Sequence, residues 1–320
     1  MAILNMVQAI NLALRQEMAR DDRVVILGED VGRDGGVFRV TEGLVERFGG
    51  ERVIDTPLSE SAIVGAAIGM AAYGLRPVAE IQFMGFIYAA FDQLATHAVR
   101  IRSRSRSRYS SPLVVRTPYG AGIRAPELHE ESTEAFFCHL PGIKVVVPSG
   151  PYTAKGLLLS AIRDPDPVLF LEPTHLYRYI REEVPDEEYT TPIGRARVAK
   201  EGGAVTVIAW GSMLEKVLKT VGTRDVEVID LLTINPFDFA TVIDSVKKTG
   251  RAVIVHEAVM TCGFGAEISA TLAEEAILHL RAPILRVAAP DVTMPLPKLE
   301  SRYLPSAERI NKAIDEVLRY

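Results

Sequence analysis

The chain passes from a strand into a helix at Ile54-Asp55-Thr56-Pro57-Leu58-Ser59-Glu60-Ser61-Ala62-Ile63-Val64-Gly65. A strand over residues 52–55 ends at Asp55, and Pro57 favours an extended approach to the helix because proline restricts the residue before it. Ser59 is a typical N-cap residue, so Glu60 falls in the first turn of the helix. An acid in that turn most often only stabilises the helix dipole, by about 0.3–1 kcal/mol. Spacing alone therefore assigns no chemistry to Glu60.

The same step from strand to helix recurs along the chain. Short, continuous apolar runs predict strands at residues 24–27, 52–55, 77–83, 113–116, 143–147 and 168–171. Helical patterns separate them, at residues 61–73, 86–102, 133–138 and 152–162. Such an alternation predicts a parallel sheet covered on both faces, with ligands bound beyond the carboxyl ends of the strands. That edge is formed by the loops after Asp55, Phe83, Arg116 and His256.

A polar segment at about residues 181–203 interrupts this alternation. It is rich in acidic residues and prolines and has little apolar periodicity, as is typical of a linker. After it, apolar runs at residues 205–210, 226–232, 252–256 and 284–287 predict a second set of strands. We therefore predict two α/β domains, a larger one over residues 1–190 and a smaller one over residues 191–320.

The composition is that of a chain that can bury a large core. Of its 320 residues 48% are hydrophobic, and the net charge of −5 is too small to indicate a nucleic-acid partner. The two cysteines, Cys138 and Cys262, form neither a disulfide framework nor a metal-binding spacing, which favours a reducing compartment. The sequence has no apolar run of about 18 residues and no signal-peptide pattern. We expect a cytoplasmic protein without a membrane segment.

Three further stretches could carry chemistry. At Glu80-Ile81-Gln82-Phe83-Met84-Gly85-Phe86 a strand enters a glycine turn among aromatic residues, which are more often core residues than ligand contacts. Residues 117–129 form a long polar loop ending in His129, and functional residues concentrate in such loops, although a structural role is the commoner one for a histidine. Arg100–Arg108 contains five arginines, which suit phosphate or carboxylate binding or simply a solvated helix end. The chain has no P-loop, no Gly-x-Ser-x-Gly and no Gly-x-Gly-x-x-Gly.

Taken together, these stretches resemble the β subunits of thiamine-diphosphate-dependent 2-oxo acid dehydrogenases of the branched-chain and pyruvate type. The resemblance runs from Asn5 to Tyr320. The matching stretches are Val25-Ile26-Leu27-Gly28-Glu29-Asp30-Val31-Gly32, Asp55-Thr56-Pro57-Leu58-Ser59-Glu60, Glu80-Ile81-Gln82-Phe83, Pro141-Gly142-Ile143-Lys144-Val145-Val146, Ala154-Lys155-Gly156-Leu157-Leu158, Phe170-Leu171-Glu172-Pro173, Glu227-Val228-Ile229-Asp230-Leu231 and Gly265-Ala266-Glu267-Ile268-Ser269. The resemblance implies a parallel-sheet, pyrimidine-binding α/β domain of transketolase type, followed by a smaller α/β domain of the transketolase C-terminal type.

The resemblance also implies an activity. It is that of a β subunit in an α₂β₂ enzyme that decarboxylates a 2-oxo acid on thiamine diphosphate and reductively acylates the lipoyl group of an acyltransferase component. Glu60 matches the glutamate that hydrogen-bonds N1′ of the cofactor's pyrimidine ring. Leu58, Gln82 and Phe86 match positions around that ring, with Phe86 as the stacking platform. His129 matches the histidine that assists acylation of the lipoyl group.

The metal sites are expected to be divided between two chains. Chains that bind the diphosphate through Mg²⁺ carry Gly-Asp-Gly with a later asparagine, whereas this chain has no Gly-Asp-Gly and no asparagine between Asn11 and Asn235. The α chain is therefore expected to supply the Mg²⁺ site. Some relatives hold a structural K⁺ at a loop matching residues 161–166, where Ala161 and Asp164 are the candidate ligands.

Two features depart from the family pattern. Relatives usually have His-Ser-Gln where this chain has His129-Glu130-Glu131, which would place negative charge beside the histidine, and many have aspartate in place of Gly85. Pyruvate and branched-chain 2-oxo acids both remain open as substrates. Two alternative functions also remain, a β subunit of acetoin dehydrogenase and a non-catalytic β-like scaffold subunit.

Overall fold

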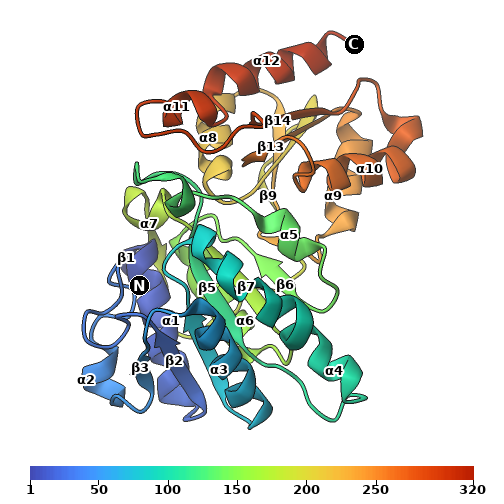
Figure 1. Cartoon of the computed structure of the whole chain (residues 1–320). Helices are drawn as coiled ribbons and strands as arrows, with labels where there is room; N and C mark the ends of the chain where they lie inside the picture. The colour runs from blue at the N-terminus through green and yellow to red at the C-terminus, as the bar shows by residue number, and fades with distance from the viewer.

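The computed structural model describes residues 1–320, apart from the side chain of Glu127. Its lower half is built on a seven-stranded sheet in the order β12-β6-β7-β5-β4-β2-β3 (Figure 1). β12 pairs antiparallel with β6, and all other neighbours in this sheet pair in parallel. The strands are β2 Val24–Gly28, β3 Val53–Asp55, β4 Arg76–Glu80, β5 Val114–Tyr119, β6 Lys144–Val146, β7 Val168–Pro173 and β12 Thr233–Asn235.

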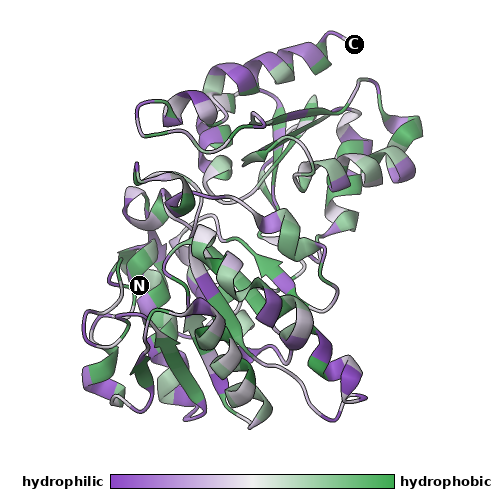
Figure 2. Ribbon diagram, viewed as in Figure 1, coloured by the Kyte–Doolittle hydropathy of each residue, from purple (hydrophilic) through white to green (hydrophobic). Residues whose placement is uncertain are grey.

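Alternate residues of the central strands enter two different cores. In β7, Leu169 and Leu171 pack in the core that includes α3, whereas Val168 and Phe170 pack in the core that includes α1 and α6. Hydrophobic residues accordingly run along these strands (Figure 2). The covering helices are α1 Met6–Arg20, α3 Glu60–Ala72 and α6 Pro151–Arg163. The predicted parallel sheet with two covered faces is thus confirmed.

The upper half contains a five-stranded sheet in the order β14-β13-β10-β11-β9. Only β9 runs antiparallel to its neighbour. The strands are β9 Arg197–Lys200, β10 Val205–Ala209, β11 Val226–Asp230, β13 Ala252–Val259 and β14 Leu285–Ala289. The accompanying helices are α8 Ser212–Val221, α9 Phe239–Thr249, α10 Gly265–Ala276 and α12 Ala307–Leu318, and α12 exposes a strongly hydrophilic side (Figures 1 and 2).

The two halves share buried residues. One hydrophobic cluster contains Val145 and Leu171 from the first sheet together with Ile208 and Ile229 from the second. In addition, β12 follows the predicted boundary in the sequence but pairs with β6 of the first sheet. The division at residues 190 and 191 stays a proposal, and residues 233–235 cross it.

The predicted linker is wrong in its secondary structure. Residues 181–203 contain two strands, β8 Arg181–Val184 and β9 Arg197–Lys200. β8 pairs antiparallel with β1 Ala2–Asn5, and β9 joins the edge of the second sheet. Both partners are far away in the sequence, and the pairing therefore cannot be recognised from local periodicity.

The helix predicted over residues 86–102 is also not a regular α-helix. The segment is divided into a 3₁₀ helix η1 (Met84–Ala90), a π-type turn η2 (Gln93–His97), a second 3₁₀ turn η3 (Ala98–Arg100) and α4 (Ile101–Arg104). Such irregular turns often occur where tertiary contacts or function determine the backbone. The remaining short elements are α2 Leu44–Phe48, η4 Glu127–His129, α5 Glu134–Cys138, α7 Leu176–Tyr179, η5 Ile277–His279 and α11 Glu300–Tyr303. In the described part of the chain, the helices are too short or too polar to span a membrane.

Candidate active site

Glu60 is the first residue of α3, immediately after the loop that leaves β3. Ser59 occupies the N-cap position in an extended conformation, but its side chain makes no capping hydrogen bond. Within the described residues the half-buried Glu60 carboxyl has no hydrogen bond and no ion pair, and Leu58 is 78% exposed. Both side chains are therefore available to a ligand or to another chain.

A second acidic residue lies near Glu60 and was not recognised as a site residue from the sequence. Glu29 follows β2, the strand between β3 and β4 in the sheet. Burial raises the pKa of Glu29, and the negative charges of Glu60 and Asp30 raise it further. The Gln82 amide in turn donates a hydrogen bond to Asp30 at 3.4 Å. The signal that could have found Glu29 is its position directly after a buried strand.

His129 lies against two aromatic rings of the neighbouring loop. Its ring centroid is 4.4 Å from that of Phe83 and 5.1 Å from that of Phe86, in edge-to-face arrangements. Phe83 and Phe86 are themselves 5.4 Å apart. Phe83 is buried and Phe86 is half-buried, so Phe86 keeps part of its ring accessible. The structure thus brings His129 and Phe86 together, while Gln82 lies between β4 and η1 with its side chain on Asp30.

A buried ion-pair network connects the strands β4, β5 and β7 beneath these loops. Arg116 in β5 donates to both carboxylate oxygens of Glu172, at 2.6 and 2.7 Å, and also pairs with Glu80. The hydroxyl of Tyr177 donates to Glu172 at 2.5 Å. Because each charged group is paired and hydrogen-bonded, the network can hold the strand ends rigid in the interior.

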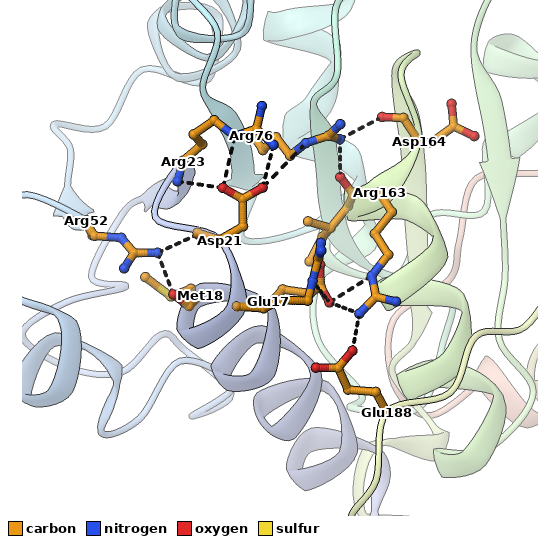
Figure 3. A network of polar contacts seen from close by, with 11 residues as sticks. Glu17, Met18, Asp21, Arg23, Arg52, Arg76, Arg163, Asp164 and Glu188 are labelled. Atoms are coloured by element: carbon orange, nitrogen blue, oxygen red, sulfur yellow. Dashed lines mark hydrogen bonds and ion pairs between the residues drawn. The ribbon is translucent and has the colours of Figure 1, made fainter.

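The candidate K⁺ loop lies at the opposite, amino edge of the sheet. Arg76 donates to the carbonyl oxygens of Ile162 and Asp164, at 2.7 and 3.2 Å, and Lys144 donates to the Asp164 carboxylate at 2.6 Å. Figure 3 shows Arg76 between Asp21 on one side and Asp164 of this loop on the other. No group of three or more His, Cys, Asp or Glu residues able to hold a metal occurs among the described residues. The oxygens near Asp164 already have cationic partners within the chain.

The arginine run is only partly engaged. Arg102 pairs with Asp166 at 2.6 Å, and Arg100 donates to the backbone carbonyl of Ala95 at 2.9 Å. The side chains of Arg104, Arg106 and Arg108 are exposed. For Arg104, Arg106 and Arg108 the structure therefore agrees with the interpretation of the arginine run as a solvated helix end.

A cluster of buried polar groups lies where the two sheets meet. It comprises Tyr119 at the end of β5, Glu134 on α5, Trp210 after β10 and Glu257 on β13. The Tyr119 hydroxyl, the Trp210 ring nitrogen and both carboxyl oxygens of Glu134 are buried without a hydrogen bond of good geometry. Burial is the main cause that raises the pKa of Glu134 and of Glu257, the latter to about 8. At neutral pH the Glu257 carboxyl therefore favours its neutral form in the folded chain.

Replacing Glu257 by Gln should change the pH dependence of unfolding. The folded chain keeps the Glu257 proton up to about pH 8, whereas an ordinary glutamate loses it near 4.5. Between these values the unfolded chain binds fewer protons, so the wild-type free energy of unfolding falls with pH, by at most about 1.4 kcal/mol per unit. Above about pH 8 this loss is complete. The groups acting on Glu257 are Ser212, Lys216, Glu134 and Glu300.

The measurement is the difference in unfolding free energy between the Gln variant and the wild type, from pH 5 to pH 9. We expect this difference to grow in favour of the variant up to about pH 8 and then to stay constant. Any contribution of His256 to the pH dependence cancels in this difference, because His256 is present in both chains. An unchanged difference across the range would contradict the assignment of a buried, protonated Glu257.

Comparison with known proteins places the whole chain in one group. A family model described as the transketolase pyrimidine-binding domain matches residues 3–180, and a model of the transketolase C-terminal domain matches residues 194–310. The chain is 51% identical to the pyruvate dehydrogenase E1 component subunit beta of Staphylococcus epidermidis, over 100% of both chains. It is also 51% identical to the subunit of the same name from Acholeplasma laidlawii, over 97% of this chain and 96% of that one. A solved structure described as a split-gene transketolase, inactive β4 tetramer, matches the fold with a TM-score of 0.81 at 21% identity, over 99% of each chain.

Proposed function

The chain belongs to the transketolase-like family of thiamine-diphosphate-dependent 2-oxo acid dehydrogenase β subunits, and on that premise we propose that it contributes half of an active site for pyruvate. The observation that carries this proposal is the edge of the seven-stranded sheet, where the carboxyl of Glu60 is unpaired and Leu58 is exposed. An acid, an amide and an aromatic ring at one edge suit a flat nitrogen heterocycle. The similarity to pyruvate dehydrogenase β subunits supports pyruvate, rather than a branched-chain 2-oxo acid, as the proposed substrate of this chain.

Each residue of the site has a distinct proposed role. Thiamine diphosphate, when bound, supplies the electron sink for decarboxylation. Glu60 would hold or release a proton at N1′ of the pyrimidine ring, from the start of a helix that fixes its position. Phe86 would stack on the ring, and Gln82 would orient it together with Leu58. His129 would donate a proton to the lipoyl sulfur during acylation of the acyltransferase component.

The proposal places the rest of the site on an α subunit in an α₂β₂ assembly. This chain lacks the Gly-Asp-Gly motif, so Mg²⁺ and the diphosphate would be held by that partner. Leu58, two residues before Glu60, is exposed, which supports a site that is completed by a second chain. The cytoplasm is the proposed location, and the two free cysteines, Cys138 and Cys262, agree with a reducing compartment.

We also propose that the loop of Ala161 and Asp164 binds a K⁺ ion with a purely structural role. Its support is the concentration of backbone and carboxylate oxygens, the atoms that hard cations prefer. An ion there would share oxygens with Arg76 and Lys144, which already bind Ile162 and Asp164. No chemical step in this proposal depends on it.

The test is reconstitution of this chain with an α partner in the presence of thiamine diphosphate and Mg²⁺. We expect negligible cofactor binding by the chain alone, cofactor binding by the pair, and faster CO₂ release from pyruvate than from branched-chain 2-oxo acids. Cofactor binding is measured by calorimetry and CO₂ release with an artificial electron acceptor, with the α chain alone as the control.

The other outcomes separate the alternatives. Tight cofactor binding by the lone chain would overturn the half-site model. Turnover of acetoin without turnover of 2-oxo acids would favour an acetoin dehydrogenase subunit. A complete assembly that binds cofactor but turns over none of these substrates would favour a scaffold subunit.

A further inference from the structure

The loop that carries His129 closes on itself at its base. The Gly120 amide donates to the carbonyl oxygen of Glu131 at 3.0 Å, which joins the two ends of the loop. The His129 amide donates to the carbonyl oxygen of Pro126 at 2.9 Å. These backbone bonds define a compact loop over residues 120–131, which we call the histidine loop. They do not by themselves fix its position relative to Phe83 and Phe86.

Glu130 organises the interior of the histidine loop. Its side chain is only 3% exposed, and one carboxylate oxygen accepts the amides of Ile123 and Ala125, at 3.1 and 3.2 Å. Glu130 therefore connects the segment directly after His129 to the opposite side of the loop through one carboxyl oxygen, while its other oxygen is buried without a hydrogen-bond partner among the described residues.

Glu131 connects the histidine loop to the neighbouring element. The hydroxyl of Tyr88, on η1, donates to the Glu131 carboxylate. Burial and then this hydrogen bond raise the pKa of Tyr88, so the hydroxyl keeps the proton that it donates. Because η1 also carries Phe86, the contact links the loop that carries His129 to the segment that carries the stacking ring.

Gly85 provides the space that this arrangement needs. A Cβ atom added to Gly85 would lie 2.3 Å from the carbonyl oxygen of Leu128 and 2.9 Å from its Cα. Since both are backbone atoms, no flexible side chain can move aside. A residue with a side chain at position 85 would force Leu128, and with it His129, away from η1. The two departures from the family pattern, Gly85 and Glu130-Glu131, are thus parts of one arrangement.

We propose that Glu130 and Glu131 are positioning residues for His129, and that they hold its ring against Phe83 and Phe86 before any partner binds. The inference rests on the proposed function for the role of His129 in lipoyl acylation. Each carboxylate accepts a hydrogen bond from a donor other than His129, and this is the contact through which it would position the loop.

The first test uses the reconstituted α/β pair and variants at Glu131 and Tyr88. Glu131→Ala and Tyr88→Phe should each lower kcat for lipoyl acylation by about tenfold, since small misplacements of a catalytic group are costly. KM for the lipoyl domain and acceptor-coupled decarboxylation should stay within about twofold of the wild type. Glu131→Gln should restore most of the rate, because its amide oxygen can still accept from Tyr88. The double variant should be no slower than either single one, because both remove the same contact.

The second test does not depend on activity. Hydrogen exchange of the lone chain should speed up at the amides of Ile123 and Ala125 in Glu130→Ala, and over the histidine loop in Glu131→Ala. Glu274→Ala, at an exposed position of α10, is the matched control and should change neither exchange nor acylation. Unchanged exchange in the loop variants would overturn the inference.

His129→Ala separates failure of this inference from failure of the proposed function. If that variant acylates lipoyl groups normally, the role of His129 is wrong and the positioning proposal falls with it. If it loses acylation while Glu131→Ala acylates at the wild-type rate, only the positioning proposal is overturned. A parallel fall of acylation and decarboxylation in Glu131→Ala would also overturn it, because the loop would then serve the cofactor pocket.

Discussion

Glu60→Gln should lower pyruvate decarboxylation by the reconstituted pair by about 10²–10⁴-fold, the range typical of general acid–base groups. Gln keeps the size of the side chain and its hydrogen-bonding oxygen but cannot exchange a proton with the pyrimidine ring. Glu60 begins α3 and has no partner within the described residues, so its loss breaks no contact that holds the chain together. We therefore expect assembly with the α chain and thermal stability close to those of the wild type.

The measurements for Glu60→Gln are acceptor-coupled CO₂ release, cofactor affinity by calorimetry and assembly by size-exclusion chromatography. The matched control is Ser59→Ala, because the Ser59 side chain makes no capping hydrogen bond and its removal should leave the helix start intact. Turnover at the wild-type rate in Glu60→Gln would remove Glu60 from the mechanism. Loss of assembly would instead assign it a structural role.

The core of the fold could be predicted because its signal is local. The strand Val168–Pro173 begins with four apolar residues, 168–171, which enter two cores in alternation. Burial on both faces requires such a run, so the pattern and its cause coincide. β8 and β12 lack this signal because they are short and depend on partners far away in the sequence. The helix predicted over residues 86–102 failed for a related reason, since Gly85 and Tyr88 adapt to the distant histidine loop.

The site was accessible to sequence reasoning only through resemblance. From spacing alone Glu60 stabilises a helix start and His129 is one loop histidine among six histidines in the chain. The alternation of strands and helices predicted only that the site lies at the carboxyl edge of the sheet, because ligands bind beyond the carboxyl ends of parallel strands. This alternation could not give the proximity of Glu29 to Glu60 or the hydrogen bond between Tyr88 and Glu131, since both join separate loops. Such contacts exist only once the strands have been ordered in the sheet.

His129→Ala should separate the two half-reactions of the proposed activity. Acylation of lipoyl domains should fall by about 10²–10⁴-fold, because the sulfur leaving the ring would lose its positioned proton donor. Decarboxylation coupled to an artificial electron acceptor should largely survive, since an acceptor of this kind needs no proton from His129. The packing of the ring supports this separation, because His129 contacts Phe83 and Phe86, while Glu60 begins the separate helix α3.

Both rates are measured on one preparation of the pair, with a lipoyl domain and with the artificial acceptor. His279→Ala, at an exposed position in η5, is the matched control and should leave both rates unchanged. Normal acylation in His129→Ala would remove the transfer role. An equal fall of both rates would place His129 in the cofactor pocket, because its ring centroid lies 5.1 Å from that of Phe86, the residue proposed to stack on the cofactor. Only a fall in lipoyl acylation without a fall in decarboxylation would assign His129 to acyl transfer and leave the proposed cofactor pocket around Phe86 intact.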